Sequence, residues 1–351
     1  MGYRPSYPSW RAQDIQVLHA AHSLSTLGHP VTLLANRFNP DITSTDILSS
    51  YDLSKCDTFD FRLSPSTHLG MSGLWFRQSV IQWWMRHTGA VIVRDIERFS
   101  QLQRWLPKTQ RIIIEAHQLP SIQAVDQGLP PEKWQKIEKK MLQQAWGIVS
   151  NCGGVMDLWR HQYPSRCPDK QLILHNGTSP SRACTSSQND DIIRCLGSLR
   201  PEKGIHGLLP AISKSPVPIE FIGASQEEMA MLGDLPPHIT VRQAVPYPDV
   251  PHLLATSKAL LLPLQNNRFG RSLTSPLKLW DYLATDRPIL APDLQSVREI
   301  EARTNREMVF YNPDNPNDLL RHLKAPLPEK VNPFLRSWAD RAEELSVFLS
   351  L

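Results

Sequence analysis

The segment Ile192–Leu209, which reads IIRCLGSLRPEKGIHGLL, carries the local pattern that decides the fold. An apolar run of strand-forming residues is followed by a glycine-containing turn and then by apolar residues at helical spacing. A strand that leads through a turn into a helix is the repeating unit of a parallel α/β sheet. Doubly wound sheets bind ligands at the carboxyl ends of their strands. We therefore expect a doubly wound domain with a ligand site at this turn.

The same alternation continues towards the C-terminus. The further strand-like runs are PIEFIGAS from Pro218, HITVRQAV from His238, KALLLPL from Lys258, RPILAP from Arg287 and MVFYNP from Met308. The last segment, Phe334–Leu349, has apolar residues on one helical stripe, namely Leu335, Trp338, Ala342, Leu345 and Phe348. We expect this helix to pack back towards the N-terminal part of the chain.

A second alternating region precedes the first. Its strand-like runs are VTLLA after Pro30, AVIVRD ending at Asp95, RIIIEAH ending at His117, GIVSN ending at Asn151 and LILHN ending at Asn176. Helical spacing is found over residues 15–27, 73–87 and 134–146. The opening GYRPSYPSWRAQ leads into the first helix without an apolar strand, so we expect the first strand to be missing or its position to be filled differently.

The chain length of 351 residues suits two α/β domains, because one hydrophobic core rarely serves so many residues. The polar stretch TSPSRACTSSQNDD, Thr178–Asp191, lacks any periodicity and is interpreted as the linker. The expected domains are residues 1–180 and 181–332, followed by a C-terminal helical segment over residues 333–351.

Composition excludes several classes of protein. With 41% hydrophobic and 21% charged residues the chain is typical of globular proteins, and its net charge of +4 includes no dense basic run of the kind that binds nucleic acid. The five cysteines are scattered without a C-x-x-C pair, so neither a disulfide framework nor a zinc site is indicated. With no apolar run long enough to span a bilayer, we expect a cytoplasmic protein.

The first candidate site is the turn in GSLRPEKGI. Arg200 and Lys203 lie beside a helix start, where two positive charges suit the negative charges of a diphosphate, and Gly204 keeps the approach open. Taken alone, an R-x-x-K spacing is more often a solvated turn. Its combination with a second motif, described next, favours a diphosphate-binding site over a solvated turn.

That second motif is SLTSPLKLWDYLATDRPILAPD, Ser272–Asp293, in which a helix is expected to begin near Pro276. The backbone N–H groups of Leu277 and Lys278, together with the Lys278 charge, would favour a phosphate at the helix N-terminus. Asp281 follows about one turn later and could accept hydrogen bonds from ribose hydroxyls. The alternative is a plain helix start followed by a solvated aspartate.

These motifs, in this order, resemble the C-terminal lobe of family 4 glycosyltransferases over residues 191–330. The N-terminal landmarks IVRD, IIIEAHQLP, IVSN and ILHNGTSP resemble that family more weakly. The resemblance implies a GT-B fold, in which two Rossmann-like, doubly wound domains face a cleft. It also implies a retaining transfer of sugar from a nucleotide-diphosphate sugar, with no cofactor and no essential metal. The N-terminal domain would bind the acceptor and the C-terminal domain the nucleotide sugar.

The resemblance assigns roles to individual residues. Lys203 and Asp281 are expected to take part in catalysis as well as donor binding. Arg200 matches one of the family's basic residues that bind the diphosphate. In many members that arginine lies directly after the glycine, where this chain has Ser198. The expected donor contacts are Ser198, Arg200, Lys203, Gly223, Val245, Tyr247, Ser275, Leu277, Lys278 and Asp281. Of the family's two glutamates, eight positions apart, Asp281 fills the second position while Leu273 occupies the first.

In the N-terminal half, His117 in EAHQLP is expected to act near the transferred sugar, because family members with E-x-H use their histidine there. A histidine that merely caps a strand end is the alternative. Arg11 and Arg94 fall at loop ends beside the expected binding edge of the first sheet. Each is either a contact to the acceptor or an ordinary surface charge. His19, His22 and His29 are expected to be structural, and no metal site is expected.

The apolar cluster Leu74–Met85 adjoins Arg77, Arg86 and His87, so two interpretations stay open: packing against the sheet, or peripheral contact with a membrane. For the whole chain, the alternatives to a transferase are a nucleotide-sugar epimerase, a glycogen-type phosphorylase that carries pyridoxal phosphate, or a catalytically degenerate sugar-nucleotide-binding protein. Donor sugar, nucleotide base, acceptor and oligomeric state are not encoded in any of these motifs.

Overall fold

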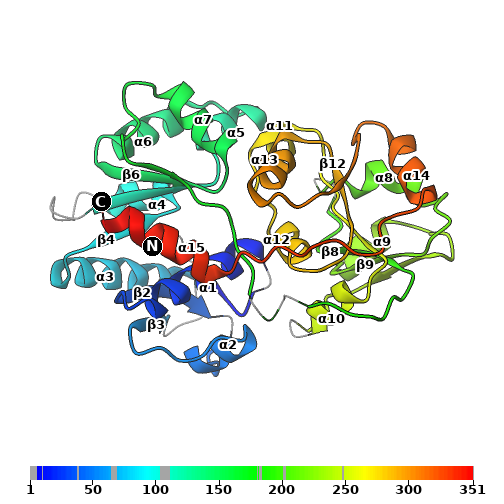
Figure 1. Ribbon diagram of the computed structural model, residues 1–351. Coiled ribbons are helices and arrows are strands. Elements are labelled where there is room, and N and C mark those ends of the chain that lie inside the picture. The colour runs from blue at the N-terminus through cyan, green and yellow to red at the C-terminus, as the bar shows by residue number, and fades with distance from the viewer. Residues whose placement is uncertain are drawn as a thin grey trace. The chain divides into compact units, whose positions relative to one another are not determined.

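The computed structural model consists of two compact units (Figure 1). Unit 1 comprises residues 1–175 and 338–351, and unit 2 comprises residues 176–337. The structure describes residues 6–9, 11–37, 39–64, 69–102, 111–179, 181, 184–200, 203–246 and 249–350, with the backbone alone for residues 69–72.

Unit 1 contains two parallel sheets. The first has the order β1-β2-β3, formed by Ser6–Tyr7, Val31–Arg37 and Phe59–Leu63. The second has the order β4-β5-β6-β7, formed by Ala90–Val93, Arg111–Ala116, Ala145–Ser150 and Gln171–Ile173. The strands of the second sheet follow one another in sequence order. Each apolar run expected in the N-terminal half forms a strand of one of the two sheets.

The helices of unit 1 include α15 from the far end of the chain. They are α1 (Ala12–Thr26), α2 (Ser44–Ser50), α3 (Leu69–Arg86), α4 (Ile96–Leu102), α5 (Pro120–Asp126), α6 (Glu132–Leu142), α7 (Gly153–Gln162) and α15 (Trp338–Ser350). Buried residues of α1 and α15 pack with Ile113 and Val149 of the four-stranded sheet in one apolar cluster. The predicted return of the C-terminal helix is therefore confirmed.

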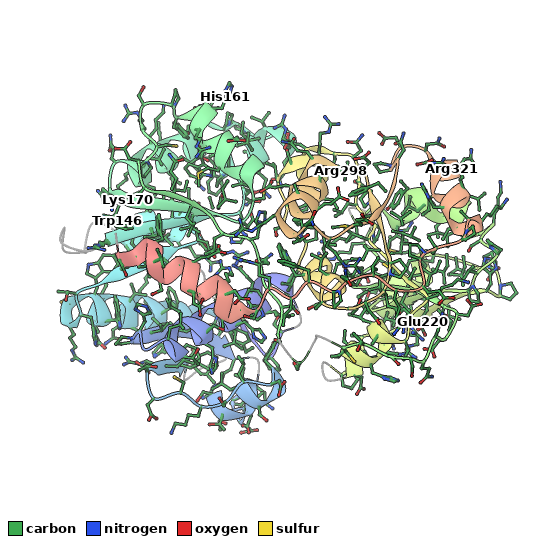
Figure 2. All side chains as sticks on the ribbon, in the orientation of Figure 1. Trp146, His161, Lys170, Glu220, Arg298 and Arg321 are labelled. Atoms are coloured by element: carbon green, nitrogen blue, oxygen red, sulfur yellow. The ribbon has the colours of Figure 1, made fainter. Side chains whose placement is uncertain are left out.

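Two aromatic contacts fix α15 in unit 1. His19 of α1 stacks on Trp338 at a centroid distance of 5.5 Å, and Phe348 packs edge-on against Trp146 at 5.4 Å. Figure 2 shows Trp146 beside Lys170, whose ammonium lies 4.5 Å from the ring centroid.

Three local features of unit 1 were not predicted from the sequence. Ser6–Tyr7, expected in a loop, form a short strand that pairs with Asn36 and Arg37. Phe59–Leu63 form a strand that the sequence did not indicate, because charged residues interrupt FDFRL. The helix expected to reach Trp146 ends at Leu142, since residues from Ala145 onwards pair with β5.

Unit 2 has one six-stranded parallel sheet with the order β10-β9-β8-β11-β12-β13. Its strands are β8 (Ile193–Leu196), β9 (Ile219–Ile222), β10 (Ile239–Arg242), β11 (Ala259–Leu261), β12 (Ile289–Pro292) and β13 (Val309–Tyr311). Strands β8 to β10 extend the sheet in one direction and β11 to β13 in the other. The topological switch point therefore lies between β8 and β11, which is where such sheets bind ligands.

Helices cover both faces of this sheet. They are α8 (Ile205–Ile212), α9 (Gln226–Met231), α10 (Val250–Ala255), α11 (Arg268–Ser272), α12 (Leu277–Leu283), α13 (Gln295–Thr304) and α14 (Pro316–Lys324). Alternate strand residues separate two cores, because Leu261 packs with Leu208 of α8 whereas Leu260 packs with Leu279 of α12. The predicted doubly wound arrangement is thus confirmed for unit 2.

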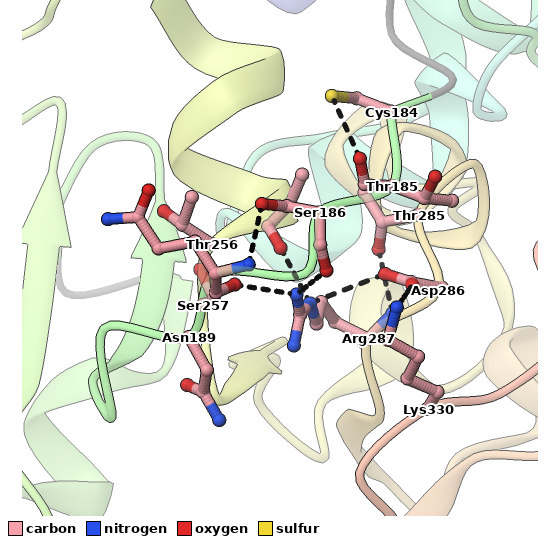
Figure 3. Close-up of polar contacts among 12 residues, drawn as sticks. Cys184, Thr185, Ser186, Asn189, Thr256, Ser257, Thr285, Asp286, Arg287 and Lys330 are labelled. Carbon is pink, nitrogen blue, oxygen red and sulfur yellow. Dashed lines mark hydrogen bonds and ion pairs between the residues drawn. The ribbon is translucent and has the colours of Figure 1, made fainter.

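The polar stretch that precedes β8 is bound to the body of unit 2 (Figure 3). Arg287, whose side chain is 3% exposed, donates to the carbonyls of Ser186 at 2.6 Å and Gln188 at 2.9 Å. Asp190 N–H donates to the Thr256 carbonyl at 2.8 Å. Buried guanidinium groups need such partners, so residues 186–190 are held against unit 2.

Candidate functional site

Two glycines bring the backbones together at the carboxyl ends of β8 and β9. Gly197 follows β8 with φ +103°, and Gly223 follows β9 with φ +116°. A Cβ atom on Gly223 would lie 3.1 Å from Cα of Gly197. Only glycine combines this left-handed backbone with so close an approach. Glycine at both positions therefore lets the backbones of the two strand ends pack directly against each other.

The two sequence motifs meet at Gly197. A Cβ atom on Gly197 would lie 3.4 Å from Nζ of Lys278, so the α12 lysine extends to the turn after β8. Tyr282, one turn further along α12, accepts a hydrogen bond from Leu196 N–H at 2.8 Å. Both contacts join segments that are about 80 residues apart in the chain.

The turn with Arg200 and Lys203 packs against the loop after β11. Gly204, the N-cap of α8, has φ +85°, and a Cβ atom there would lie 2.9 Å from both N of Gln265 and the carbonyl carbon of Leu264. Lys203 N–H donates to the Arg200 carbonyl at 2.8 Å, which closes the turn. Gly204 therefore packs against the loop after β11, next to the switch point between β8 and β11.

Glu228 of α9 supports this turn, and the sequence motifs did not identify it. Its carboxylate accepts from Leu199 N–H at 3.1 Å and lies 3.8 Å from Nε of the largely exposed Arg200. Glu228 also forms the capping box of α9 with Ser225. The signal S-x-x-E was present in the sequence, but it predicts only the helix start and not the contact with the turn.

The start of α12 agrees with the expectation, because Pro276 is its N-cap and Leu277 its first helical residue. The amides of Leu277 and Lys278 are thus the first two of the helix, which lack a helical carbonyl to bind. Ser275 is buried, and its hydroxyl accepts from Trp280 Nε1–H at 2.9 Å. The Ser275 side chain therefore links the residue before the N-cap to the first turn of α12.

Asp281 of α12 has a partner that sequence reasoning missed. Thr178 donates from its hydroxyl to Oδ1 of Asp281 at 2.5 Å. Thr178 itself is held by a hydrogen bond from its N–H to the Arg336 carbonyl at 2.8 Å. A ligand hydroxyl at Asp281 would therefore join or replace the Thr178 hydroxyl.

The other expected donor contacts are spread over the same edge. Ser198 is half-buried in the turn after β8, and Val245 is half-buried in the segment after the edge strand β10. Tyr247 lies outside the described residues. Leu273, at the position of the family's first glutamate, is buried at the end of α11. An apolar side chain there has no means to bind a sugar hydroxyl.

A second group of polar side chains lies in unit 1, around Glu115 of β5. Its Oε1 accepts from Nε2 of Gln16 at 2.9 Å and from Nη2 of Arg341 at 3.0 Å, and Nε2 of His117 lies 3.6 Å away. Arg94 donates to the side-chain carbonyl of Gln16. The structure thus brings together two of the predicted residues, His117 and Arg94, through three that the sequence did not single out.

Burial and charge set the protonation of this group. Burial alone would raise the pKa of the Glu115 carboxyl, but the contact with His117 and the charges of Arg94 and Arg341 outweigh it and hold that pKa below its usual range. Burial, with the charge of Arg94, lowers the pKa of His117 to about 4. His117 is therefore neutral at pH 7 and can both donate and accept a hydrogen bond.

The remaining candidates lie apart from this group. Arg11 is exposed at the start of α1, and the structure records no side-chain contact between it and Glu115. His22 bonds to the Ser54 carbonyl at 2.7 Å, and His29 bonds to the Ser346 hydroxyl at 2.7 Å. Across the described residues, no three His, Cys, Asp or Glu side chains are grouped as metal ligands.

The aromatic helix α3 has one buried and one exposed face. Phe76 and Trp84 are buried, whereas Leu74 is 68% and Met85 66% exposed. Core packing thus accounts for Phe76 and Trp84 of the apolar cluster Leu74–Met85, and not for its exposed residues Leu74 and Met85. Within the part of the chain that the structure describes, no helix is both long and apolar enough to cross a bilayer.

Part of this chain is similar in sequence to a known protein family. Residues 190–327 match the sequence model of a family described as glycosyl transferases group 1. No curated protein matches the chain.

Solved glycosyltransferase structures share the fold over nearly the whole chain. WaaG, a glycosyltransferase involved in lipopolysaccharide biosynthesis, has 13% identity and a TM-score of 0.62 over 99% of this chain and 95% of its own. HepE of Anabaena in complex with UDP has 13% identity and a TM-score of 0.60 over the same shares. The lipopolysaccharide outer core galactosyltransferase WaaB has 14% identity and a TM-score of 0.60, with 99% and 98% covered. The predicted GT-B fold is confirmed.

Proposed function

We propose that this protein is a glycosyltransferase that moves a sugar from a nucleotide-diphosphate sugar to an acceptor with retention at the anomeric carbon. The observation that carries the proposal is the meeting of Gly197, Gly223 and Lys278 with the Arg200–Lys203 turn at the switch point of unit 2. The match to group 1 glycosyl transferases covers this region, and UDP occurs in the similar structure of HepE.

Catalysis would be mainly electrostatic. When the bond from the anomeric carbon to the diphosphate breaks, the leaving diphosphate takes the electron pair and gains negative charge. Lys203, Arg200 and Lys278 would stabilise that charge more strongly than the charge of the bound donor, which is the condition for acceleration. These cations supply the charge that a metal ion would otherwise bring, so we propose that no essential metal or other cofactor is needed.

Asp281 would bind the ribose of the nucleotide, and Ser198, Gly223, Val245 and Tyr247 would line the donor site with it. The bond from Thr178 supports this role for Asp281, because it shows that the carboxylate is placed to accept from a hydroxyl. The neutral amide N–H groups of Leu277 and Lys278 would add to phosphate binding, with Ser275 fixing their helix start.

Unit 1 would bind the acceptor. His117 and Arg94 support this assignment, since both belong to the polar group around Glu115 at the carboxyl edge of its sheet. Arg11 remains a proposed acceptor contact on its position at the start of α1 alone.

The test is an assay of UDP release from a panel of UDP-sugars, run with and without EDTA. The proposal expects sugar release or transfer with UDP as the second product, at a rate that EDTA does not change. A nucleotide-sugar epimerase would instead return an isomerised UDP-sugar without UDP. A phosphorylase would show the absorbance of pyridoxal phosphate.

A catalytically degenerate sugar-nucleotide-binding protein is the second candidate function. The buried Leu273 favours it, because an apolar side chain occupies the position of a family acid. Calorimetric binding of a UDP-sugar without any turnover in the same buffer would identify this case.

We also propose peripheral contact with the cytoplasmic face of a membrane through α3. The exposed Leu74 and Met85 lie eleven residues apart, about three helical turns, and therefore on one face, next to the exposed Arg77. Sedimentation with vesicles that contain anionic lipid should be reduced in Met85→Ser and unchanged in Val347→Ser, where Val347 is an equally exposed apolar residue of α15. Equal sedimentation of the two variants would exclude α3 as the contact.

A further inference from the structure

Glu115, His117 and Asn151 are polar residues at the carboxyl ends of β5 and β6. The two strands are neighbours, with Ala116 of β5 in register with Ser150 of β6. The next residues, His117 and Asn151, therefore follow at adjacent positions along the carboxyl edge. Asn151 N–H donates to the Ala116 carbonyl at 3.3 Å, which continues the pairing past the strand ends.

The side chains of Glu115, His117 and Asn151 belong to the same face of the sheet. Glu115 and His117 are two residues apart on β5, and Glu115 is in register with Val149, which is two residues before Asn151. Val149 packs with Leu345 of α15, so this face is the one that α15 covers. The contact from Arg341 of α15 to Glu115 agrees with this assignment.

Each of the three side chains has a buried polar atom without a hydrogen-bond partner among the described residues. These atoms are Oε2 of Glu115, Oδ1 of Asn151 and Nε2 of His117, which lies 3.6 Å from Oε1 of Glu115, beyond hydrogen-bond distance. The exposed fraction is 6% for Glu115 and 8% for Asn151. Buried polar atoms are nearly always paired in native proteins, and three unpaired ones at one strand edge indicate that a ligand completes them.

The chemistry of these atoms restricts the ligand. A carboxylate oxygen and an amide carbonyl only accept hydrogen bonds, and a neutral imidazole nitrogen either accepts or donates one. The ligand must therefore bring at least two donors that lie close together. Neighbouring hydroxyl groups of a sugar ring provide them. A fully ionised phosphate and an apolar chain provide none.

We propose that Glu115, His117 and Asn151 form a hydroxyl-binding subsite for a sugar acceptor, with Asn151 as a determinant of acceptor specificity. This inference rests on the proposed glycosyltransferase function and names the class of its acceptor. Oε1 of Glu115 is held by Gln16 and Arg341, so that Oε2 is left for the ligand.

Ligand-observed saturation-transfer NMR on the full chain tests this subsite. The probes are the methyl glycosides of glucose, galactose, mannose and N-acetylglucosamine at millimolar concentration, with inorganic phosphate as the contrasting ligand. We expect at least one glycoside to bind the wild type, and Asn151→Leu to bind it about fivefold more weakly, which corresponds to one lost hydrogen bond. Phosphate should not displace it.

Ser150→Ala is the matched control, because Ser150 is the preceding residue and its buried hydroxyl donates to the Cys152 carbonyl at 2.9 Å. It should bind the glycoside as the wild type does. Asn151→Leu should unfold at the wild-type temperature or above it, since it removes an unpaired buried atom. If Asn151→Leu does not fold, Asn151→Gln, which displaces the amide by one methylene, takes its place and should weaken binding likewise.

Equal glycoside binding in the wild type and the Asn151 variant overturns the proposal, as does the absence of binding by every glycoside, or displacement by phosphate. UDP affinity, measured by calorimetry in the same variants, reports on unit 2. A wild type that binds a glycoside through Asn151 but no UDP would contradict the proposed function and leave the subsite standing. A wild type that binds UDP but no glycoside would contradict the subsite and leave the proposed function standing.

Discussion

Replacing Gly204 by alanine tests whether the turn that carries Arg200 and Lys203 has to lie against the loop after β11. Gly204 has φ +85°, and an added Cβ would lie 2.9 Å from backbone atoms of both Leu264 and Gln265. Backbone atoms cannot rotate away as a flexible side chain can. The turn after β8 would therefore have to move away from the switch point, and the basic residues would move with it.

The expected loss of stability has two parts. A left-handed backbone costs alanine about 1 to 2 kcal/mol relative to glycine. Forcing a methyl group against packed backbone adds about 1 to 3 kcal/mol. Gly233→Ala is the control that isolates the second part, because Gly233 has φ +64° but nothing within 4 Å of an added Cβ. Gly204→Ala should therefore be the less stable variant by about 1 to 3 kcal/mol.

Thermal unfolding and UDP calorimetry measure the two consequences. The variants are compared with each other within the same unit, so no two-state assumption is needed for the order of their midpoints. We expect Gly204→Ala to have the lower midpoint and a UDP affinity reduced about tenfold, and Gly233→Ala to bind UDP normally. Equal midpoints together with unchanged UDP affinity in both variants would refute the packing of the turn against Gln265.

The remaining predictions concern single charged or titratable groups. Lys203→Ala should weaken UDP binding by about 1.5 to 3 kcal/mol, whereas exposed Lys214→Ala in the same unit should not change it in calorimetry. Asp281→Asn should raise the donor KM and leave kcat nearly intact, because ribose hydroxyls do not change during transfer; a collapse of kcat at constant KM would place Asp281 at the sugar instead. His117→Ala should lower turnover at unchanged UDP affinity, and a kcat within about a factor of two of the wild type would make His117 structural. Because the pKa of His117 is lowered from 6.5 to about 4 on folding, the unfolded chain binds more protons between these values, and up to about 3 kcal/mol of stability should be lost as the pH falls from 6.5 to 4. His117→Gln should flatten that loss in unfolding experiments at a series of pH values, and an unchanged slope would contradict the depressed pKa.

The apolar strands of both units could be predicted from sequence because a parallel strand buried on both faces forms a continuous apolar run. The runs at Arg111–Ala116 and Ile289–Pro292 are of this kind. Phe59–Leu63 could not be recognised, since it belongs to a sheet edge and alternates apolar with charged residues. Ser6–Tyr7 are too few to give any periodicity.

The site was predictable only as far as its motifs extend along the chain. Lys278 was identified from its helix start and Lys203 from its turn, whereas Gly197, where the two motifs meet, was not singled out. Their supporting partners come from elsewhere, such as Glu228 beneath the turn and Thr178 on Asp281. Side chains with an ordinary local role carry no sign of a contact that forms only in the folded chain.

Incubation of the protein with UDP-sugars, followed by proton NMR of the released sugar, tests the central claim most directly. A retaining glycosyltransferase releases UDP and gives a product whose first-formed anomer is that of the donor, and Lys203→Ala should slow this release at least about tenfold. UDP binding without release of UDP from any donor would contradict transferase activity. An inverted first anomer would contradict retention.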